Sequence, residues 1–327
     1  MRIRKTTEQD LPAVMAIYAA ARAFMAETGN PRQWGATCWP PEALIREDIR
    51  RGRSYVCLSD GDEAAATFFF DKGMDIEPTY RDIRDGDWLD DGPYGVVHRI
   101  AADKRRPEKG VGAFCLNWAF SRCGHLRIDT HGDNRVMQGL LRKLGFTLCG
   151  TIFVAEDNDP RLAFEKTDGF VCRMPTEAEM VRRWDDEIAR QADKANWIAW
   201  KEGALASARA GRTLPYYGFL DGVPVCEATA DPDPDLPQPL DGKTVELCAF
   251  RTVPEHRGKG YFSRLMAYIL HDLGRRGFTR AVVGVEPQEE RNRALYRHWG
   301  FTEPAGRDTE TYPDGTVIDV EFFARPL

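Results

Sequence analysis

The chain has 327 residues, more than one compact core usually needs, so we expect two domains. Hydrophobic residues make up 43% and charged residues 29%, which excludes a disordered chain and is typical of a globular enzyme. The 45 Lys and Arg against 51 Asp and Glu give a net charge of −6, which argues against a protein that coats nucleic acid. No apolar run approaches the roughly 20 residues of a membrane span.

The N-terminus does not resemble an export signal. Basic residues occur within Met1–Lys5, but no apolar stretch of the signal-peptide type follows them. The eight cysteines include no C-x-x-C pair, which argues against a zinc ribbon or a redox dithiol. We therefore expect reduced thiols, no metal site, no membrane association and a cytoplasmic location.

The first half alternates predicted strands and helices. It opens on a short strand near Arg2, and a helix follows from Asp10-Leu-Pro to about Glu27, with proline in its first turn. The remaining predicted elements are a strand at 94–102, a glycine turn at 109–112, a helix at 113–121, a strand at 125–130, a helix at 134–143 and a closing Gly145-Phe146.

The second half repeats this order. Its elements are an opening strand near Phe170, a strand at 244–250, a glycine turn at 257–260, a helix at 261–273, a strand at 281–285, a helix at 289–298 and a closing Gly300-Phe301. The glycine turns are 150 residues apart and the Gly-Phe pairs 155 residues apart, a register that unrelated domains would rarely keep. We therefore predict two domains, 1–168 and 169–327. The proline-rich stretch 231–239 is predicted to be a loop inside the second.

The strongest local motif is the segment Val253–Phe262. It places Arg257-Gly-Lys-Gly260 between a predicted strand and a predicted helix. Backbone N–H groups at a helix N-terminus hold an anion such as a phosphate, and the Arg and Lys charges add to this. The segment is not a Walker loop, because Gly260 follows Lys259, and Ser263 stands where a dinucleotide fingerprint needs glycine. A plain tight turn is the alternative.

This arrangement resembles the GNAT acyltransferase superfamily. The residues that carry the likeness are Arg257-x-x-Gly260-x-Phe262 and Leu295-Tyr296-Arg-His-Trp-Gly300-Phe301, and it covers essentially the whole chain as two tandem copies. The likeness implies a mixed α/β fold. In each half, a mostly antiparallel sheet would have splayed fourth and fifth strands and flanking helices. It also implies acetyl-CoA as the co-substrate.

The same likeness implies donor-binding residues in both halves. In the second half, the strand backbone at 250–252 would face the pantetheine arm and the glycine turn would hold the pyrophosphate. Those second-half residues are Phe250, Arg251, Thr252, Arg257, Gly258, Lys259, Gly260, Tyr261 and Phe262. Their first-half counterparts are Ile100, Ala101, Ala102, Lys109, Gly110, Val111 and Gly112, together with Asn134 at the start of the last helix. Phe262 departs from the family pattern, which has a small residue there.

Acyl transfer to an amine needs a base and an acid, because an ammonium group must lose a proton before it attacks a thioester. By the family likeness, Tyr296 takes the place of the acid and Glu246 that of the carboxylate base. A core aromatic is the alternative role for Tyr296, and a solvated strand residue that for Glu246.

The first half departs further from the family pattern. Pro107 replaces the motif arginine, and Leu141 replaces the tyrosine, so we expect this half mainly to bind. Candidate acceptor-site or titrating residues there are Trp34, in the aromatic segment 33–39, and His98, Asp129 and His131.

Two function classes remain open. The first is an N-acetyltransferase whose acceptor is an amine of a small molecule or peptide, with the second half as the catalyst. The second is a sensor or scaffold that binds acyl-CoA with little turnover. Binding of nucleic acid is disfavoured by the acidic balance, and no sequence feature indicates the oligomeric state.

Overall fold

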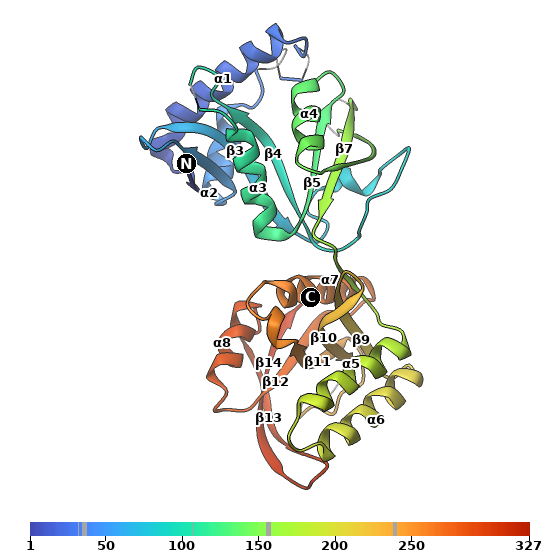
Figure 1. Ribbon diagram of the computed structural model, residues 1–327. Helices are drawn as coiled ribbons and strands as arrows, with labels where there is room; N and C mark the ends of the chain where they lie inside the picture. Colours follow the sequence, from blue (N-terminus) through green and yellow to red (C-terminus); the bar gives the residue numbers. More distant parts are fainter. Residues whose placement is uncertain (32, 35–37, 107, 155–157, 238–240) are drawn as a thin grey trace. The chain divides into compact units, whose positions relative to one another are not determined.

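A computed structural model of the chain describes residues 1–31, 33–34, 38–106, 108–154, 158–237 and 241–327. It divides into two compact units, Met1–Asp168 and Gly169–Leu327. Each unit is built on one seven-stranded mixed sheet with helices packed against it (Figure 1), so the predicted mixed α/β fold class is confirmed. Three sequence features, Pro107, residues 35–37 and residues 238–239, lie outside the described residues.

The first unit has seven strands, four α-helices and two short 3-10 helices among its described residues. They are β1 (Arg2–Lys5), η1 (Glu8–Asp10), α1 (Leu11–Glu27), α2 (Glu42–Arg50), β2 (Ser54–Leu58), β3 (Ala64–Gly73), η2 (Pro78–Arg81), β4 (Tyr94–Ala102), α3 (Val111–Cys123), β5 (His125–His131), α4 (Arg135–Lys143), β6 (Thr147–Phe153) and β7 (Pro160–Thr167).

The second unit repeats this arrangement in its described residues. Its elements are β8 (Phe170–Arg173), α5 (Glu177–Arg190), α6 (Ala195–Arg209), β9 (Leu214–Leu220), β10 (Val223–Asp231), β11 (Thr244–Thr252), η3 (Pro254–His256), α7 (Tyr261–Arg275), β12 (Arg280–Val285), α8 (Glu290–His298), β13 (Glu303–Thr311) and β14 (Val317–Pro326). The strand orders are β1-β2-β3-β4-β5-β7-β6 and β8-β9-β10-β11-β12-β14-β13, so the two sheets share one topology.

The fourth strand of each sheet carries a bulge. Arg99 in β4 has φ 52° and Ala249 in β11 has φ 54°, in the left-handed region that side chains other than glycine rarely adopt. These residues are 150 positions apart, the same separation as the glycine turns. Both strands show a register shift against the third strand at this point. The bulge is therefore a shared feature of the repeat.

The fourth and fifth strands run parallel for a few residues and then separate (Figure 1). Pairing of β4 with β5 covers Gly95↔Leu126 and Val96↔Arg127, and pairing of β11 with β12 ends at Leu247↔Val283. Beyond these points the backbone of β4 and β11 does not pair with the fifth strand. This confirms the splayed strands that the family likeness implied.

Apolar side chains cover both faces of each sheet. On β4, Val97 packs with residues of α3 and α4, whereas its neighbour Val96 packs with Tyr80 and Tyr94. Such alternation is what a strand buried on both faces requires. In the second unit Leu247 of β11 packs in the core that α7 and α8 complete. Among the described residues, none of the helices combines the length and apolar character that crossing a membrane would need.

Candidate active site

In the second unit, a cleft of about 1000 Å³ opens where β11 and β12 separate. Its walls come from the end of β11, the glycine turn, the first turn of α7, helix α8 and parts of α5 and α6. Residues predicted from the sequence contribute much of this lining. They are Phe250, Arg251, Thr252, Arg257, Gly258, Gly260, Tyr261, Phe262 and Tyr296.

The glycine turn leaves open space beside the start of α7. Gly258 and Gly260 have φ of 73° and 84°, and a Cβ atom added to either would meet no atom within 4 Å. Gly260 is the N-cap of α7, so the first backbone N–H groups of the helix have no partner within it. Arg257 donates from Nε to the carbonyl oxygen of Thr252 at 3.1 Å. These features suit an anion such as a pyrophosphate.

Tyr296 lies on α8 and is 9% exposed. Its ring meets that of Phe250 edge-on, with centroids 5.6 Å apart. Burial, followed by the charges of Glu289 and Cys248, raises the pKa of the Tyr296 hydroxyl to about 12. The hydroxyl therefore keeps its proton near neutral pH and can donate it.

Glu246 lies on β11, four residues before Phe250, and does not line the cleft. Because Leu247 points into the core that contains Tyr296, strand alternation places Glu246 on the other face of the sheet. Burial, followed by the charges of Asp231 and Glu310, raises the pKa of Glu246 to about 7. This carboxyl group can therefore exchange a proton near neutral pH.

Phe262, the departure from the family pattern, packs within an aromatic cluster. Its ring stacks on Trp299 at 5.2 Å and meets Phe250 at 5.4 Å between centroids. The counterpart in the first unit is Gly112, where an added Cβ would approach Leu140 within 3.2 Å. In the second unit, aromatic rings thus fill the space beside Phe262. In the first unit, tight packing closes the corresponding space beside Gly112.

A buried ionic network adjoins the cleft. Arg183, 1% exposed, contacts Glu187 at 2.8 Å and Glu227 at 3.0 Å. Glu227 also pairs with Arg251 at 2.8 Å, and the guanidinium carbon of Arg251 lies 3.6 Å from the ring centroid of Trp184. These contacts fix Arg251, which lines the cleft, to helix α5.

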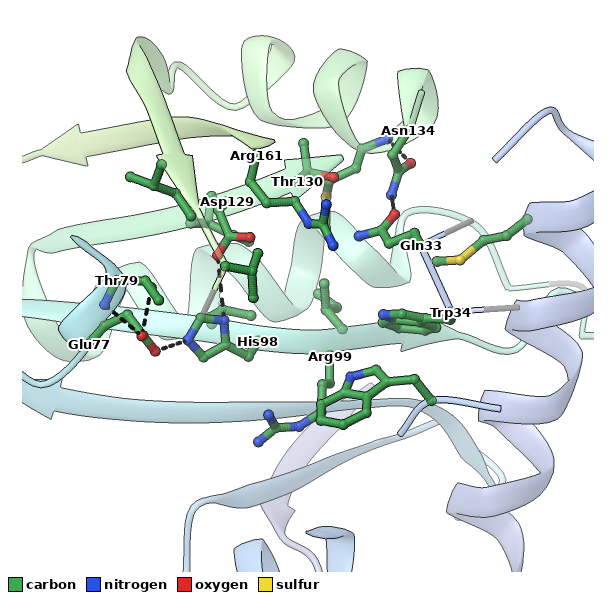
Figure 2. A pocket seen from close by; sticks show the side chains of 18 of the residues that line it. Gln33, Trp34, Glu77, Thr79, His98, Arg99, Asp129, Thr130, Asn134 and Arg161 are labelled. Carbon is green, nitrogen blue, oxygen red and sulfur yellow. Dashed lines mark hydrogen bonds and ion pairs between the residues drawn. The ribbon is translucent and has the colours of Figure 1, made fainter. Parts of the chain in front are cut away.

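The first unit has its own pocket, of about 680 Å³, where β4 and β5 separate. Figure 2 shows the ring of His98 with Glu77 on one side and Asp129 on the other. Nε2 of His98 lies 2.8 Å from Oε2 of Glu77, and Nδ1 lies 3.7 Å from Oδ1 of Asp129. Thr79 donates its backbone N–H and hydroxyl to Glu77, and the hydroxyl of Tyr80 donates to Asp129 at 2.8 Å.

The charge state of Glu77 follows from these contacts. Burial by itself raises the pKa of Glu77, but the hydrogen bond and charge of His98 and the donors of Thr79 outweigh it and lower the pKa to about 2. Glu77 is therefore an ionised acceptor at neutral pH.

Comparisons with known proteins identify the family of the chain. The sequence model of the acetyltransferase (GNAT) family matches residues 171–301, inside the second unit. A GNAT-family acetyltransferase from Streptococcus agalactiae is 31% identical, over 51% of this chain and 94% of its own length, with a TM-score of 0.47. The chain belongs to the GNAT acetyltransferase family.

Two further solved structures are less similar to this GNAT protein. The putative acetyltransferase yncA from Salmonella typhimurium, solved with acetyl-CoA, is 22% identical over 49% of this chain and 94% of its own, with a TM-score of 0.35. The ribosomal-protein-S18-alanine N-acetyltransferase from Escherichia coli is 19% identical over 48% of this chain and 93% of its own, with a TM-score of 0.38. None of the curated proteins matches the chain significantly.

In this GNAT chain, some of the remaining predicted site residues line the cleft or the pocket and others do not. Lys259 is exposed outside the cleft. Trp34, His98, Ile100, Asp129 and Asn134 line the first pocket, whereas Ala101, Ala102, Lys109, Gly110, Val111, Gly112 and His131 do not. Asn134 caps α4 by accepting from the N–H of Met137 and donates to Gln33 at 3.0 Å. The described residues hold no group of three or more His, Cys, Asp or Glu side chains suited to a metal ion.

Several residues of the two sites were not predicted from the sequence. They are Glu77 and Thr79 in the first unit, and Arg183, Glu187 and Glu227 in the second. Glu77 stands before Pro78 as the N-cap of a short 3-10 helix, and this position was the one local signal for it. No local pattern indicates that it meets His98, 21 residues later.

The raised pKa of Glu246 predicts a pH-dependent effect of Glu246→Gln on stability. Since the folded pKa is about 7 and the ordinary value 4.5, the stability of the wild type falls as pH rises from about 4.5 to 7. We expect the variant to match the wild-type Tm at pH 5 and to exceed it at pH 8. A gain of about 1 kcal/mol in the free energy of unfolding at pH 8 would raise the Tm by roughly 2–4 °C. Thermal unfolding followed by circular dichroism measures this. Substitution of the exposed Glu202 by Gln is the control. If the Glu246→Gln variant and the wild type had equal Tm values at pH 5 and also at pH 8, the raised pKa of Glu246 would be contradicted.

Proposed function

We propose that the protein is an acetyl-CoA-dependent N-acetyltransferase whose second unit transfers an acetyl group to an amine of a small molecule or peptide. The observation that carries this proposal is that one cleft brings together the glycine turn before α7, the free edge of β11 and the protonated Tyr296 hydroxyl. These features support a single cavity in which the donor and the proton donor for its leaving thiolate would lie together.

Donor binding uses the backbone more than side chains. The pyrophosphate of acetyl-CoA would lie against the N–H groups from Gly258 to Phe262, with Arg257 beside it. The pantetheine arm, which carries amide groups, would pair with β11 beyond Leu247, where β12 has separated. Because both contacts use main-chain groups, the side chains of the turn are free to differ from the family pattern.

Proton transfer is divided between the two faces of the sheet. Glu246 in its ionised form accepts a proton from the acceptor ammonium, directly or through water, and the free amine attacks the thioester carbonyl carbon. The C–N bond forms and the C–S bond breaks. Tyr296 donates its proton to the departing thiolate and is reprotonated by the proton that the nitrogen releases. Glu246 releases its own proton to solvent, so the products are an amide, a thiol and one proton.

Removing the Tyr296 hydroxyl tests the acid. In Tyr296→Phe the ring keeps its packing against Phe250. For an amine acetylated by the second unit we expect kcat to fall by about 10²–10⁴-fold with little change in the KM for acetyl-CoA, because the proton is needed in the transition state. Steady-state release of the CoA thiol measures both constants. Tyr268→Phe, elsewhere in the same unit, is the control. An undiminished kcat would remove Tyr296 from the chemistry.

Blocking the open space at the glycine turn tests the donor site. Gly260→Val adds a side chain where the phosphate would approach, so we expect the Kd for coenzyme A to rise by tenfold or more, about 1.4 kcal/mol. Gly277→Val is the matched control: Gly277 also has a positive φ and open space, so backbone strain is similar, but it lies outside the cleft. Isothermal titration calorimetry measures the Kd. Equal weakening by both substitutions would attribute the effect to strain alone.

A further inference from the structure

We propose that the first unit holds a second catalytic centre, in which Nδ1 of His98 removes a proton from a primary amine that is then acetylated. This goes beyond the function proposed for the second unit: it shares the donor, acetyl-CoA, but uses a different site, base and acceptor pocket. Leu141 is fully buried at the position that corresponds to Tyr296, so the chemistry of this unit cannot use the family's tyrosine.

The contact with Glu77 sets the tautomer of His98. Glu77 accepts the backbone N–H and the hydroxyl of Thr79, and an ionised carboxylate is an acceptor only. The 2.8 Å contact between Nε2 of His98 and Oε2 of Glu77 therefore requires the proton on Nε2. In the neutral ring the lone pair is then on Nδ1. Glu77 acts as a positioning residue, itself held by both donors of Thr79.

Nδ1 of His98 makes no hydrogen bond and is accessible. It lies 3.7 Å from Oδ1 of Asp129, within the range of an ion pair but too long for a hydrogen bond, and the His98 side chain is 22% exposed. Asp129 is held by the hydroxyl of Tyr80, whose pKa is raised by burial, so that hydroxyl stays protonated. An ammonium group placed beside both residues can donate one hydrogen to Nδ1 and another to Asp129.

The other two histidines of the first unit, His125 and His131, use their ring nitrogens in contacts within the fold, as structural histidines do. His125 is fully buried, with Nε2 bonded to Glu165 and Nδ1 lying 3.1 Å from the carbonyl oxygen of Pro93. In His131, Nδ1 accepts the backbone N–H of Asp133 at 3.0 Å. Among the histidines of this unit, all of them described, His98 alone presents an unbonded nitrogen to the pocket.

The pocket walls indicate the acceptor. Trp34, Trp39, Met25 and Met137 supply apolar surface, while the charged groups lie around His98. The carboxylates are Glu77 and Asp129. The two guanidinium groups, of Arg99 and Arg161, pair with Asp48 and Asp159 respectively. A volume of about 680 Å³ suits a small ligand. We infer a small primary amine with an apolar or aromatic body and its ammonium group at His98.

A donor can approach from the free edge of β4. Pairing with β5 stops at Val96, so from Val97 to Ala102 the edge of β4 that faces β5 has no strand partner, although the carbonyl oxygen of Arg99 accepts from the hydroxyl of Tyr18. Ile100 of this stretch lines the pocket. Gly110 caps α3 with φ 75° and has open space beside it, as Gly260 has in the second unit. The first unit therefore keeps the backbone features of an acetyl-CoA site.

The reaction balances with these groups. Nδ1 of His98 takes one proton from the ammonium, and the amine nitrogen attacks the thioester carbonyl carbon. The C–N bond forms, the C–S bond breaks, and the thiolate takes a second proton from the nitrogen. His98 then releases its proton to solvent, so that an ammonium and acetyl-CoA give an acetamide, coenzyme A and one proton.

The tautomer is tested without turnover. NMR of the full chain labelled with ¹⁵N-histidine resolves six rings, and His98→Gln identifies the His98 signals. We expect the neutral ring to carry its proton on Nε2, with Nδ1 bare, and Glu77→Gln to mix the two tautomers. A proton on Nδ1 in the wild-type neutral ring, or a Glu77→Gln protein with an unchanged tautomer, would overturn the role given to these residues.

Turnover is tested in the full-length Tyr296→Phe protein, which separates this site from the second unit. With acetyl-CoA and the probe amines benzylamine, tyramine and n-butylamine, we expect thiol release that falls about 10²-fold or more on adding His98→Gln and stays unchanged with His271→Gln. Asp129→Asn should raise the KM for the amine more than it lowers kcat. Thiol release insensitive to His98→Gln, or no turnover of any probe, would overturn the proposal, whereas loss of activity by Tyr296→Phe alone bears only on the second unit.

Discussion

The bulge in the fourth strand is the constraint on which both sites depend. A continuous parallel ladder would use the backbone groups of β4 and β11 to pair with the fifth strand. The bulge residues, Arg99 and Ala249, instead adopt positive φ, and each pairing ends before them. A residue other than glycine in this conformation costs about 1–3 kcal/mol and persists only where its surroundings hold it.

The first unit shows how such a conformation is held. The side chain of Arg99 pairs with Asp48 at 2.6 Å and lies over the ring of Phe69 at 4.7 Å, while its carbonyl oxygen accepts from the hydroxyl of Tyr18 at 3.1 Å. Its neighbour His98 is thereby presented to the pocket between Glu77 and Asp129. The strained residue, Arg99, and the proposed base, His98, are thus adjacent residues of the same bulge.

The two units keep different parts of one inherited site. The second keeps Arg257 and Tyr296 but has Phe262, whose ring packs on Trp299. The first keeps the small Gly112 but replaces the tyrosine with a buried Leu141, and groups Glu77, His98 and Asp129 where the strands part. In the function we propose, the donor is held by backbone groups, which tolerate changes of side chain. The proton-transfer groups can then change in each unit independently.

The repeat could be predicted from the sequence because its signals are local. The glycine turns, the strand Tyr94–Ala102 and the helix that starts at Tyr261 follow from short contiguous patterns. The structure has the strand and the start of this helix at those bounds, whereas α3 begins at Val111, inside the turn predicted at 109–112. The neighbours of His98 could not be found in this way. Glu77 comes from the long segment between β3 and β4 and Asp129 from β5, so only tertiary packing brings them together. The same holds for Arg183 and Glu227, which lie on α5 and β10.

We propose that a bulged, splayed strand provides an acetyl-CoA site in each unit. The most direct measurement is the stoichiometry of coenzyme A binding to the full-length chain by isothermal titration calorimetry. The structure predicts two molecules bound per chain, one for each glycine turn. A stoichiometry of one or none in a fully folded protein would contradict this account.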